Sequence, residues 1–270
     1  MINLFSVKDK VIVLTGGAGV LGASMVHHFA EQGAKVVILD RNEEKGKALQ
    51  DSVRANGGEA WFLSADVLDK EALEQCYADV MEKYGRIDVL INGAGGNMPG
   101  ATIPPDKSIF DLEVDAFKKV VDLNLLGTIL PTMVFTKAMV EQKKGSIINI
   151  ASESAIRPLT RIAGYGTAKA AVVNFTKYIA GELAIKYGEG LRVNAVAPGF
   201  FLTEQNKNLL TNPDGSWTDR AKTIVAHTPF RRFGEPEELL GTMQWLASDA
   251  SKFVTGALTV VDGGFDAFSI

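Results

Sequence analysis

Short apolar runs alternate along the chain with longer segments whose apolar residues recur at helical spacing. A short apolar run such as residues 11–14 is typical of a strand buried on both faces in a parallel sheet. Strands are predicted at residues 11–14, 35–39, 60–67, 87–91, 146–151, 192–197 and 258–264. Because no proline-rich or polar linker divides this alternation, we expect residues 1–270 to form one α/β domain, a doubly wound parallel sheet with helices on both faces.

A glycine-rich turn follows the first predicted strand. Gly16, Gly17, Gly19 and Gly22 precede a segment of helical apolar spacing, residues 23–33, that ends in glycine. The Gly17-x-Gly19-x-x-Gly22 spacing satisfies the dinucleotide fingerprint, in which backbone N–H groups at a helix N-terminus bind a pyrophosphate. The alternative for this motif taken alone is an ordinary connecting turn. Its place between a strand and a helix favours a nucleotide site.

An acidic residue ends the second predicted strand. Asp40 stands about the expected distance beyond the glycines for a carboxylate that accepts hydrogen bonds from an adenosine ribose. Such a carboxylate would repel a 2′-phosphate, although Arg41 follows directly and could neutralise one. We therefore expect NAD as the cofactor, with NADP as the alternative.

The third and fourth predicted strands end in residues that can complete this site. Asp66 and Val67 are expected to border the adenine, with a helix N-cap as the alternative role for Asp66. The strand at 87–91 runs into a second glycine-rich exit, residues 92–95. Ligands of doubly wound sheets bind beyond the carboxyl ends of the strands, so both exits are expected to border one crevice.

A phenol and an ammonium group are predicted to share one helix face. Tyr165 and Lys169 are four residues apart, which places them one turn apart if the segment is helical. A phenol has an ordinary pKa near 10, and a neighbouring cation that stabilises its phenolate makes it a candidate acid/base at neutral pH. The alternative, two residues on an ordinary amphipathic helix, has to be weighed against the surrounding motifs.

Composition and charge narrow the class of protein. The chain is 46% hydrophobic and 22% charged with a net charge of −4, and no basic patch argues for nucleic acid. Cys76 is the only cysteine, which excludes an intrachain disulfide and a zinc site of several thiolates. We expect no metal. No secretory signal and no run of about 18 apolar residues is present, so a cytoplasmic protein without a membrane anchor is expected.

In this order the motifs resemble those of the short-chain dehydrogenase/reductase superfamily, a Rossmann-fold family, over essentially the whole chain. Its Thr-Gly-x-x-x-Gly-x-Gly turn is matched by Thr15, Gly16 and Gly22, with Val20 where a family glycine is expected. Its Asn-Asn-Ala-Gly segment is matched at 92–95 with one asparagine lost. The remaining matches are Asn124, Ser152 thirteen residues before Tyr165, and residues 198–203.

The resemblance implies a role for each catalytic residue. Tyr165 would exchange a proton with the substrate oxygen while a hydride moves between the nicotinamide and the substrate carbon. Lys169 would lower the phenol pKa and hold the ribose hydroxyls. Ser152 would orient the carbonyl or alcohol. It is not expected to be the nucleophile of a hydrolase, because no histidine lies in a nucleophile-base setting. Asn124 would bend its helix and anchor a water, and a buried amide satisfying the local backbone is its alternative.

The same resemblance supplies the expected cofactor contacts and assembly. Family members commonly form tetramers through the helix that begins near Tyr165, and a homotetramer is expected here. The residues expected to touch the cofactor are Gly16, Gly17, Gly19, Val20, Leu21, Gly22, Asp40, Arg41, Asp66, Val67, Asn92, Gly93, Ala94, Gly95, Tyr165, Lys169, Pro198, Gly199, Phe201 and Thr203.

Two long connections are expected to border the substrate. Residues 200–228 begin beside the nicotinamide segment, which places them as a lid that excludes water. Residues 97–110, with three prolines, border the same mouth. A pocket with two guanidinium groups and several amides suits a polyhydroxylated acid. The expected substrate residues are Asn97, Ser154, Arg157, Arg161, Gln205 and Asn206, and pairing with a surface acid is the alternative for either arginine.

Residues 92–97, 157–161 and 198–206 resemble the branch described as D-mannonate oxidoreductases, or fructuronate reductases. The leading hypothesis is therefore an NAD-dependent dehydrogenase that interconverts D-fructuronate and D-mannonate or a related keto sugar acid and its alcohol. A 3-oxoacyl carrier-protein reductase or another short-chain sugar or polyol dehydrogenase is the enzymatic alternative. A cofactor-sensing regulatory module without turnover is an alternative of a different class.

Overall fold

The computed structural model describes residues 3–202 and 210–267 and contains one parallel sheet. Its strand order is β3-β2-β1-β4-β5-β6-β7, so β1 lies between β2 and β4 at the point where the winding reverses. The strands are β1 (Val11–Thr15), β2 (Lys35–Asp40), β3 (Glu59–Ser64), β4 (Val89–Asn92), β5 (Gly145–Ile150), β6 (Leu191–Pro198) and β7 (Leu258–Val261). The predicted doubly wound parallel sheet is confirmed.

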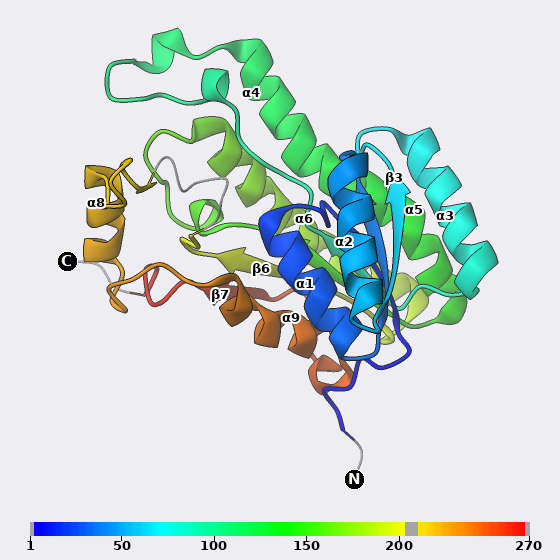
Figure 1. The fold of residues 1–270 in the computed structure, drawn as a ribbon. Coiled ribbons are helices and arrows are strands. Elements are labelled where there is room, and N and C mark those ends of the chain that lie inside the picture. The colour runs from blue at the N-terminus through cyan, green and yellow to red at the C-terminus, as the bar shows by residue number, and fades with distance from the viewer. Residues whose placement is uncertain (1–2, 203–209, 268–270) are drawn as a thin grey trace.

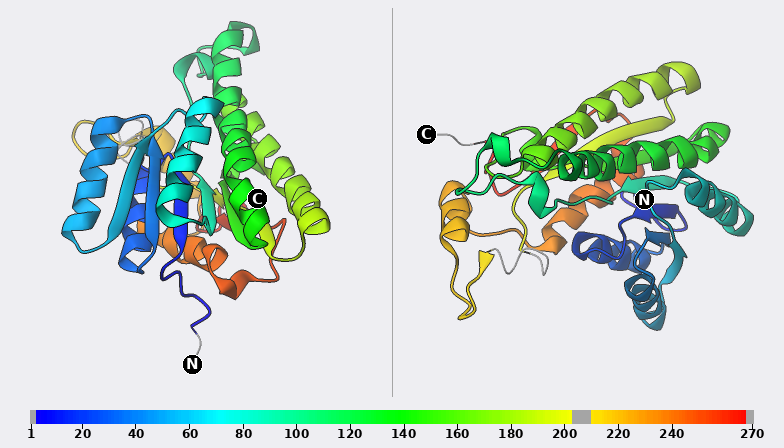
Figure 2. Two further views of the ribbon diagram at one scale, coloured as in Figure 1. Left: turned by 90° about the vertical axis from the view of Figure 1, so that its right-hand side faces the viewer. Right: turned by 90° about the horizontal axis from the view of Figure 1, so that it is seen from above.

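Helices cover both faces of this sheet (Figures 1 and 2). Alternate residues of a strand point to opposite faces, so Ile12 and Leu14 pack with α1, α2 and α9, whereas Val11 and Val13 pack with α3, α5 and α6. The α-helices are α1 (Val20–Glu31), α2 (Glu43–Ala55), α3 (Lys70–Tyr84), α4 (Val114–Val121), α5 (Gly127–Gln142), α6 (Ala163–Tyr187), α8 (Asp219–His227) and α9 (Leu240–Ala247).

Several predicted boundaries were wrong by a few residues. The third strand ends at Ser64, so Asp66 lies in the connection beyond it, and the last strand ends at Val261 before a turn in which Gly263 and Gly264 have positive φ. Turn-forming residues stop both strands earlier than their apolar neighbours suggest. The helix expected from Tyr165 onward begins at Ala163 and is confirmed.

Short irregular helices join the regular elements near the carboxyl ends of the strands. A π-helical turn, η3 (Asp122–Leu126), links α4 to α5, and η4 (Glu153–Ala155) follows β5. The other 3-10 turns are η1 (Pro99–Ala101), η2 (Ile109–Asp111), η5 (Pro236–Leu239) and η6 (Asp249–Ser251). At one end of the molecule, opposite α3, stands α8 (Figure 1).

The stretch Val114–Gln142 is long and apolar enough to cross a membrane by length and composition, and it is the one such helix in the described residues. Its most apolar window is 56% buried inside the fold. Within it, α5 packs on β4, β5 and α3, as a core helix of a soluble protein does.

A chain of buried polar side chains lies where α5 and α6 pack on β4 and β5. Asn92 Nδ2 donates to Thr132 Oγ1 (2.9 Å) and to Asn149 Oδ1 (2.8 Å), and Asn149 Nδ2 donates to Thr176 Oγ1 (2.8 Å). These bonds join β4, β5, α5 and α6. Because all four side chains are buried, loss of one partner leaves its neighbours with one hydrogen bond fewer and no water to replace it.

We expect Asn149→Ala to lower the free energy of unfolding by about 1–3 kcal/mol, since it removes one bond of Asn92 and one of Thr176. Urea denaturation measures the change. The matched control is Asn56→Ala, at an exposed position after α2, which should change stability by less than about 0.5 kcal/mol. Equal losses in the two variants would contradict the importance of the buried chain.

Candidate active site

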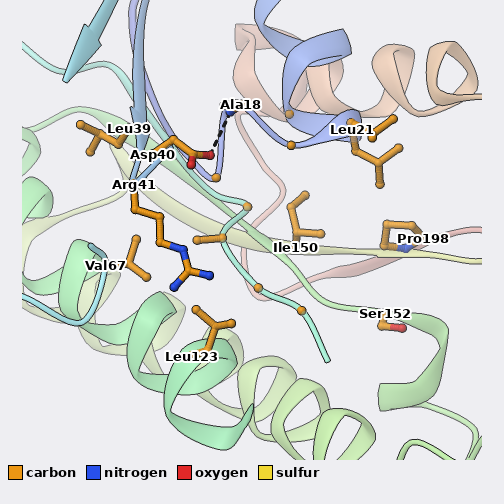
Figure 3. A pocket seen from close by; sticks show the side chains of 18 of the residues that line it. Ala18, Leu21, Leu39, Asp40, Arg41, Val67, Leu123, Ile150, Ser152 and Pro198 are labelled. Atoms are coloured by element: carbon orange, nitrogen blue, oxygen red, sulfur yellow. Dashed lines mark hydrogen bonds between the residues drawn. The ribbon is translucent and has the colours of Figure 1, made fainter. Parts of the chain in front are cut away.

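A cavity of about 530 Å³ opens at the carboxyl ends of the strands. Its wall is formed by the exits of β1, β2, β4, β5 and β6 together with residues 65–67, Leu123, Tyr165 and Lys169. Figure 3 shows Asp40 and Ser152 toward opposite ends of this pocket. The two glycine-rich exits and the Tyr165 region therefore border one crevice, as expected from the sheet topology.

The glycine turn lies against the exit of β4 with no room for side chains. A Cβ atom at Gly16 would come within 2.7 Å of Ala94 Cα, and one at Gly22 within 2.4 Å of the Gly16 carbonyl oxygen. Thr15 Oγ1 accepts hydrogen bonds from the N–H groups of Gly93 and Ala94, each at 3.2 Å. The resulting bare backbone surface at the start of α1 fits a dinucleotide diphosphate.

The β2 exit supplies a carboxylate with two cations nearby. Asp40 accepts hydrogen bonds from the N–H groups of Ala18 (3.1 Å) and Asn42 (2.9 Å), which fix its orientation. Arg41 reaches into the same pocket (Figure 3). Lys45, one turn beyond Arg41, also lines it and was missed, although its position in the first turn after the Asp40 exit was a usable signal.

Asp66 and Val67 line the pocket as expected. The N-cap alternative for Asp66 is wrong, because Asp69 caps α3 by accepting a hydrogen bond from Ala72 N–H (3.0 Å). Asp66 accepts from Leu68 N–H (2.9 Å) and stabilises the preceding turn.

Not every residue expected at the cofactor lies on the pocket wall. Gly93, Ala94 and Gly95 line it, whereas the Asn92 side chain points into the chain of buried polar side chains. Gly17 also lies behind the wall, since a Cβ atom there would meet Ile38 Cγ2 at 2.9 Å. Both residues shape the pocket from its outer side.

Asn124 supports the pocket from behind. It is fully buried in the π-helical turn, where its Nδ2 donates to the carbonyls of Gly96 (2.7 Å) and Val120 (2.8 Å) and its Oδ1 accepts from Gly96 N–H (3.2 Å). Its amide satisfies local backbone, as its alternative role predicts, while the expected bend and the anchored water stay predictions.

Ser152, Tyr165 and Lys169 meet at one end of the pocket. The Tyr165 hydroxyl lies near enough to Ser152 for that side chain to act on its pKa, and Lys169 Nζ lies 5.6 Å from the centroid of the Tyr165 ring. Lys169 Nζ donates to the Ile150 carbonyl at 2.7 Å. The three residues expected to perform the chemistry are thus brought together by β5 and α6.

Protonation of this trio differs from the expectation. Burial raises the pKa of Tyr165, and the neighbouring Ser152 side chain opposes that rise. Burial also lowers the pKa of Lys169 to about 8. The expected lowering of the phenol pKa by Lys169 does not prevail, because removal from water penalises the charged form of both groups.

The exit of β6 completes the wall with Pro198, Gly199 and Phe201, and also Phe200. Gly199 is required by a close approach, since a Cβ atom there would lie 2.6 Å from Asp262 Cβ. Thr203, Gln205 and Asn206 lie outside the described residues. The rest of the expected lid includes α8. Its residues Ala221, Ile224 and Val225 form an apolar cluster with Leu210 and Phe233, and Phe200 packs against this cluster.

The expected substrate residues separate into different environments. Arg157 Nη2 donates to the Asp266 carbonyl (2.7 Å) and its Nε lies 3.7 Å from Asp266 Oδ1, so it pairs with an acid as its alternative predicts. Ser154 is buried and donates to Ser152 Oγ (3.0 Å). Asn97 is exposed on the connection before η1.

Arg161 is exposed in a left-handed backbone conformation (φ 76°), and its carbonyl accepts a hydrogen bond from Ile103 N–H (3.0 Å). Arg220, in α8, was missed and lies close enough that its pKa is lowered by burial and also by the charge of Arg161. No ion pair joins either arginine to an acid within residues 3–202 and 210–267. Only the fold, not spacing in the sequence, brings these two cations together.

The whole chain aligns with known proteins. A family model described as enoyl-(acyl carrier protein) reductase matches residues 17–266. An uncharacterised oxidoreductase of Bacillus subtilis, UxuB, is 45% identical over 98% of this chain and 97% of its own. A 3-oxoacyl-[acyl-carrier-protein] reductase of Synechocystis is 36% identical over 96% of this chain and 98% of its own.

A solved structure extends this similarity to three dimensions. It is described as a candidate D-mannonate oxidoreductase from Haemophilus influenza with bound NAD. The two chains are 39% identical, superpose with a TM-score of 0.93, and each is covered over 99% of its length. With the glycine turn, the sheet order and the Ser152, Tyr165 and Lys169 cluster, these similarities show that the chain belongs to the short-chain dehydrogenase/reductase family and is an NAD(P)-dependent oxidoreductase acting on CH–OH groups.

Proposed function

We propose that this oxidoreductase interconverts a keto sugar acid and its alcohol, with D-fructuronate and D-mannonate as the leading pair. The observation that carries the proposal is the similarity to the Haemophilus influenza protein described as a candidate D-mannonate oxidoreductase, which is 39% identical and superposes with a TM-score of 0.93. The charge of Arg161, which acts on the pKa of Arg220, adds support for an anionic substrate. A guanidinium binds a carboxylate with two parallel hydrogen bonds, and two cations that have no acid partner among residues 3–202 and 210–267 favour an anionic substrate.

The chemistry is assigned to the trio at the Ser152 end of the pocket. When bound, the nicotinamide supplies or accepts the hydride. Tyr165 donates its proton to the substrate oxygen during reduction and takes it back during oxidation. Ser152, beside Tyr165, orients the substrate oxygen without competing for the proton. Asn124 keeps the adjoining backbone in place through its bonds to Gly96.

Lys169 links cofactor position to proton transfer. Its ammonium group would hold the ribose hydroxyls while keeping its bond to the Ile150 carbonyl. At pH 7 a group with a pKa near 8 is mainly charged, so Lys169 favours the phenolate form of Tyr165.

We also propose a preference for NAD over NADP. The Asp40 carboxylate is held by two N–H groups at the pocket wall, where it accepts ribose hydroxyls and repels a 2′-phosphate. Arg41 and Lys45 on the same wall keep NADP as the alternative. The further proposals are a cytoplasmic homotetramer and a lid formed by residues 200–228.

A 3-oxoacyl carrier-protein reductase remains the competing assignment, and the similarity to the Synechocystis enzyme favours it. That reaction needs an opening for a long acyl arm and no carboxylate clamp. The cationic pair of Arg161 and Arg220 favours the sugar acid instead.

We expect Tyr165→Phe to lower kcat by about 10²–10⁴-fold, because a phenyl ring cannot transfer the proton. NADH binding, followed by fluorescence titration, should stay close to that of the wild type. Tyr178→Phe, at an exposed position on the same helix, is the matched control and should retain activity. Substantial turnover by Tyr165→Phe would refute the assigned role.

A panel of carbonyl substrates assayed with NADH and NADPH decides the substrate class. The panel holds D-fructuronate, other keto sugar acids, a neutral keto sugar and a 3-oxoacyl thioester. We expect the highest kcat/KM with a keto sugar acid and NADH. Activity confined to the thioester would overturn the proposed function.

We expect Arg161→Ala to raise KM for the best keto sugar acid by roughly 10–100-fold, the usual worth of a charged hydrogen bond. The KM of the neutral keto sugar should change much less. Arg54→Ala, an exposed arginine in the last turn of α2, serves as the control. Equal effects of Arg161→Ala on the acid and the neutral sugar would argue against carboxylate recognition.

A further inference from the structure

Glu153 directly follows Ser152 and begins η4. It is only 1% exposed, and neither of its carboxyl oxygens has a hydrogen-bond partner among residues 3–202 and 210–267. An ionised carboxylate without partners is strongly disfavoured inside a protein. A buried acid of this kind beside Ser152 has no part in the proton transfer described above.

The charges that face Glu153 do not provide it with a free cation. Asp262 accepts hydrogen bonds from the N–H groups of Gly264 (2.8 Å) and Asp266 (2.6 Å). Arg157 is bound to Asp266. The charges of Asp266 and Asp262 disfavour an ionised Glu153, and the opposing guanidinium of Arg157 is already engaged by Asp266.

Other titratable groups come from α6, which packs against η4. They are Tyr165 and Lys169, and the Lys169 ammonium is directed to the Ile150 carbonyl. Burial, followed by the charges of Asp266 and Asp262, raises the pKa of Glu153 to about 7, and Arg157 opposes the rise. The neutral acid therefore prevails below neutral pH.

The Glu153 carbonyl accepts hydrogen bonds from the N–H groups of Ile156 (3.0 Å) and Arg157 (3.1 Å), while Ser152 Oγ accepts one from Ser154 N–H (3.2 Å). The Arg157 guanidinium in turn donates to the Asp266 carbonyl (2.7 Å), which joins η4 to the turn at 262–266. In that turn, Asp262 lies in contact distance of pocket-lining Gly199. A displacement of Glu153 from the Asp262 turn would shift η4, and with it Ser152.

We propose that Glu153 is a proton-linked positioning residue: its neutral acid lets η4 pack against the turn at 262–266, and its ionisation separates the two and displaces Ser152 and Gly199. Enzyme competence then depends on a proton that is never transferred to substrate. The inference concerns the oxidoreductase site itself, so it holds whichever carbonyl compound is reduced.

The kinetic test compares wild type with Glu153→Gln, whose amide imitates the neutral acid at every pH. The assay uses the panel compound that wild type reduces fastest, from pH 6 to pH 8. The ratio of kcat/KM for Glu153→Gln to that for wild type should rise about tenfold over this range, because one pH unit above its pKa an acid is only about one-tenth neutral. Glu141→Gln, at an exposed position on α5, should follow wild type.

Two further measurements need no substrate. Above pH 7 the NADH dissociation constant of wild type should rise relative to that of Glu153→Gln, because displacement of Gly199 alters the pocket wall. Thermal unfolding gives the sign of proton binding. The raised folded pKa means that the folded state holds the proton more tightly, so wild-type stability falls as pH rises from about 4.5 to about 7. The Tm advantage of Glu153→Gln should grow by several degrees across that window and then level off.

The inference would be overturned if the Tm of wild type and of Glu153→Gln changed in parallel with pH. It would also be overturned if the two Tm profiles diverged while kcat/KM and NADH affinity stayed parallel, because that result indicates proton uptake without positioning. If Glu153→Gln does not fold, Glu153→Met removes the acid with a side chain of similar length and is subject to the same criteria. Absence of sugar-acid turnover refutes the proposed function alone, because another panel compound or NADH binding still reports on Glu153.

Discussion

The hydroxyl of Thr15 holds together the two loops on which the pocket depends. It is fully buried at the end of β1 and accepts hydrogen bonds from the N–H groups of Gly93 and Ala94. These bonds join the exits of β1 and β4. Gly16 must then pack on Ala94 without a side chain. The diphosphate surface on one side and the Gly95 backbone on the other are both positioned by this contact.

From Gly95 the same chain of support continues to the reacting groups. A Cβ atom at Gly95 would lie 2.6 Å from Asn124 Oδ1 and 3.2 Å from Lys169 Nζ, so backbone, amide and ammonium are packed together. Lys169 reaches across to the Ile150 carbonyl at the end of β5, two residues before Ser152. Cofactor surface and proton-transfer groups are therefore parts of one packed unit rather than separate sites.

The features that could be predicted from sequence were those with local patterns. Buried strands, the glycine turn, and the spacings of Ser152, Tyr165 and Lys169 all depend on neighbours in the chain, and these predictions of fold and family were confirmed. Long-range contacts were not predictable in this way. The pairing of Arg157 with Asp266 joins residues 109 positions apart, and Arg220 meets Arg161 through the docking of α8. Desolvation, which sets the pKa values of Tyr165 and Glu153, likewise requires the packed structure.

Arg161 occupies a backbone conformation that suits glycine better than arginine. This conformation costs a residue with a side chain about 1 kcal/mol or more. The hydrogen bond from Ile103 N–H to the Arg161 carbonyl helps to hold the backbone in it. Stability alone would therefore favour glycine at this position, whereas the proposed recognition of an anion would require the guanidinium. If this loop selects the substrate as proposed, selection for activity and selection for thermal stability act on it in opposite directions.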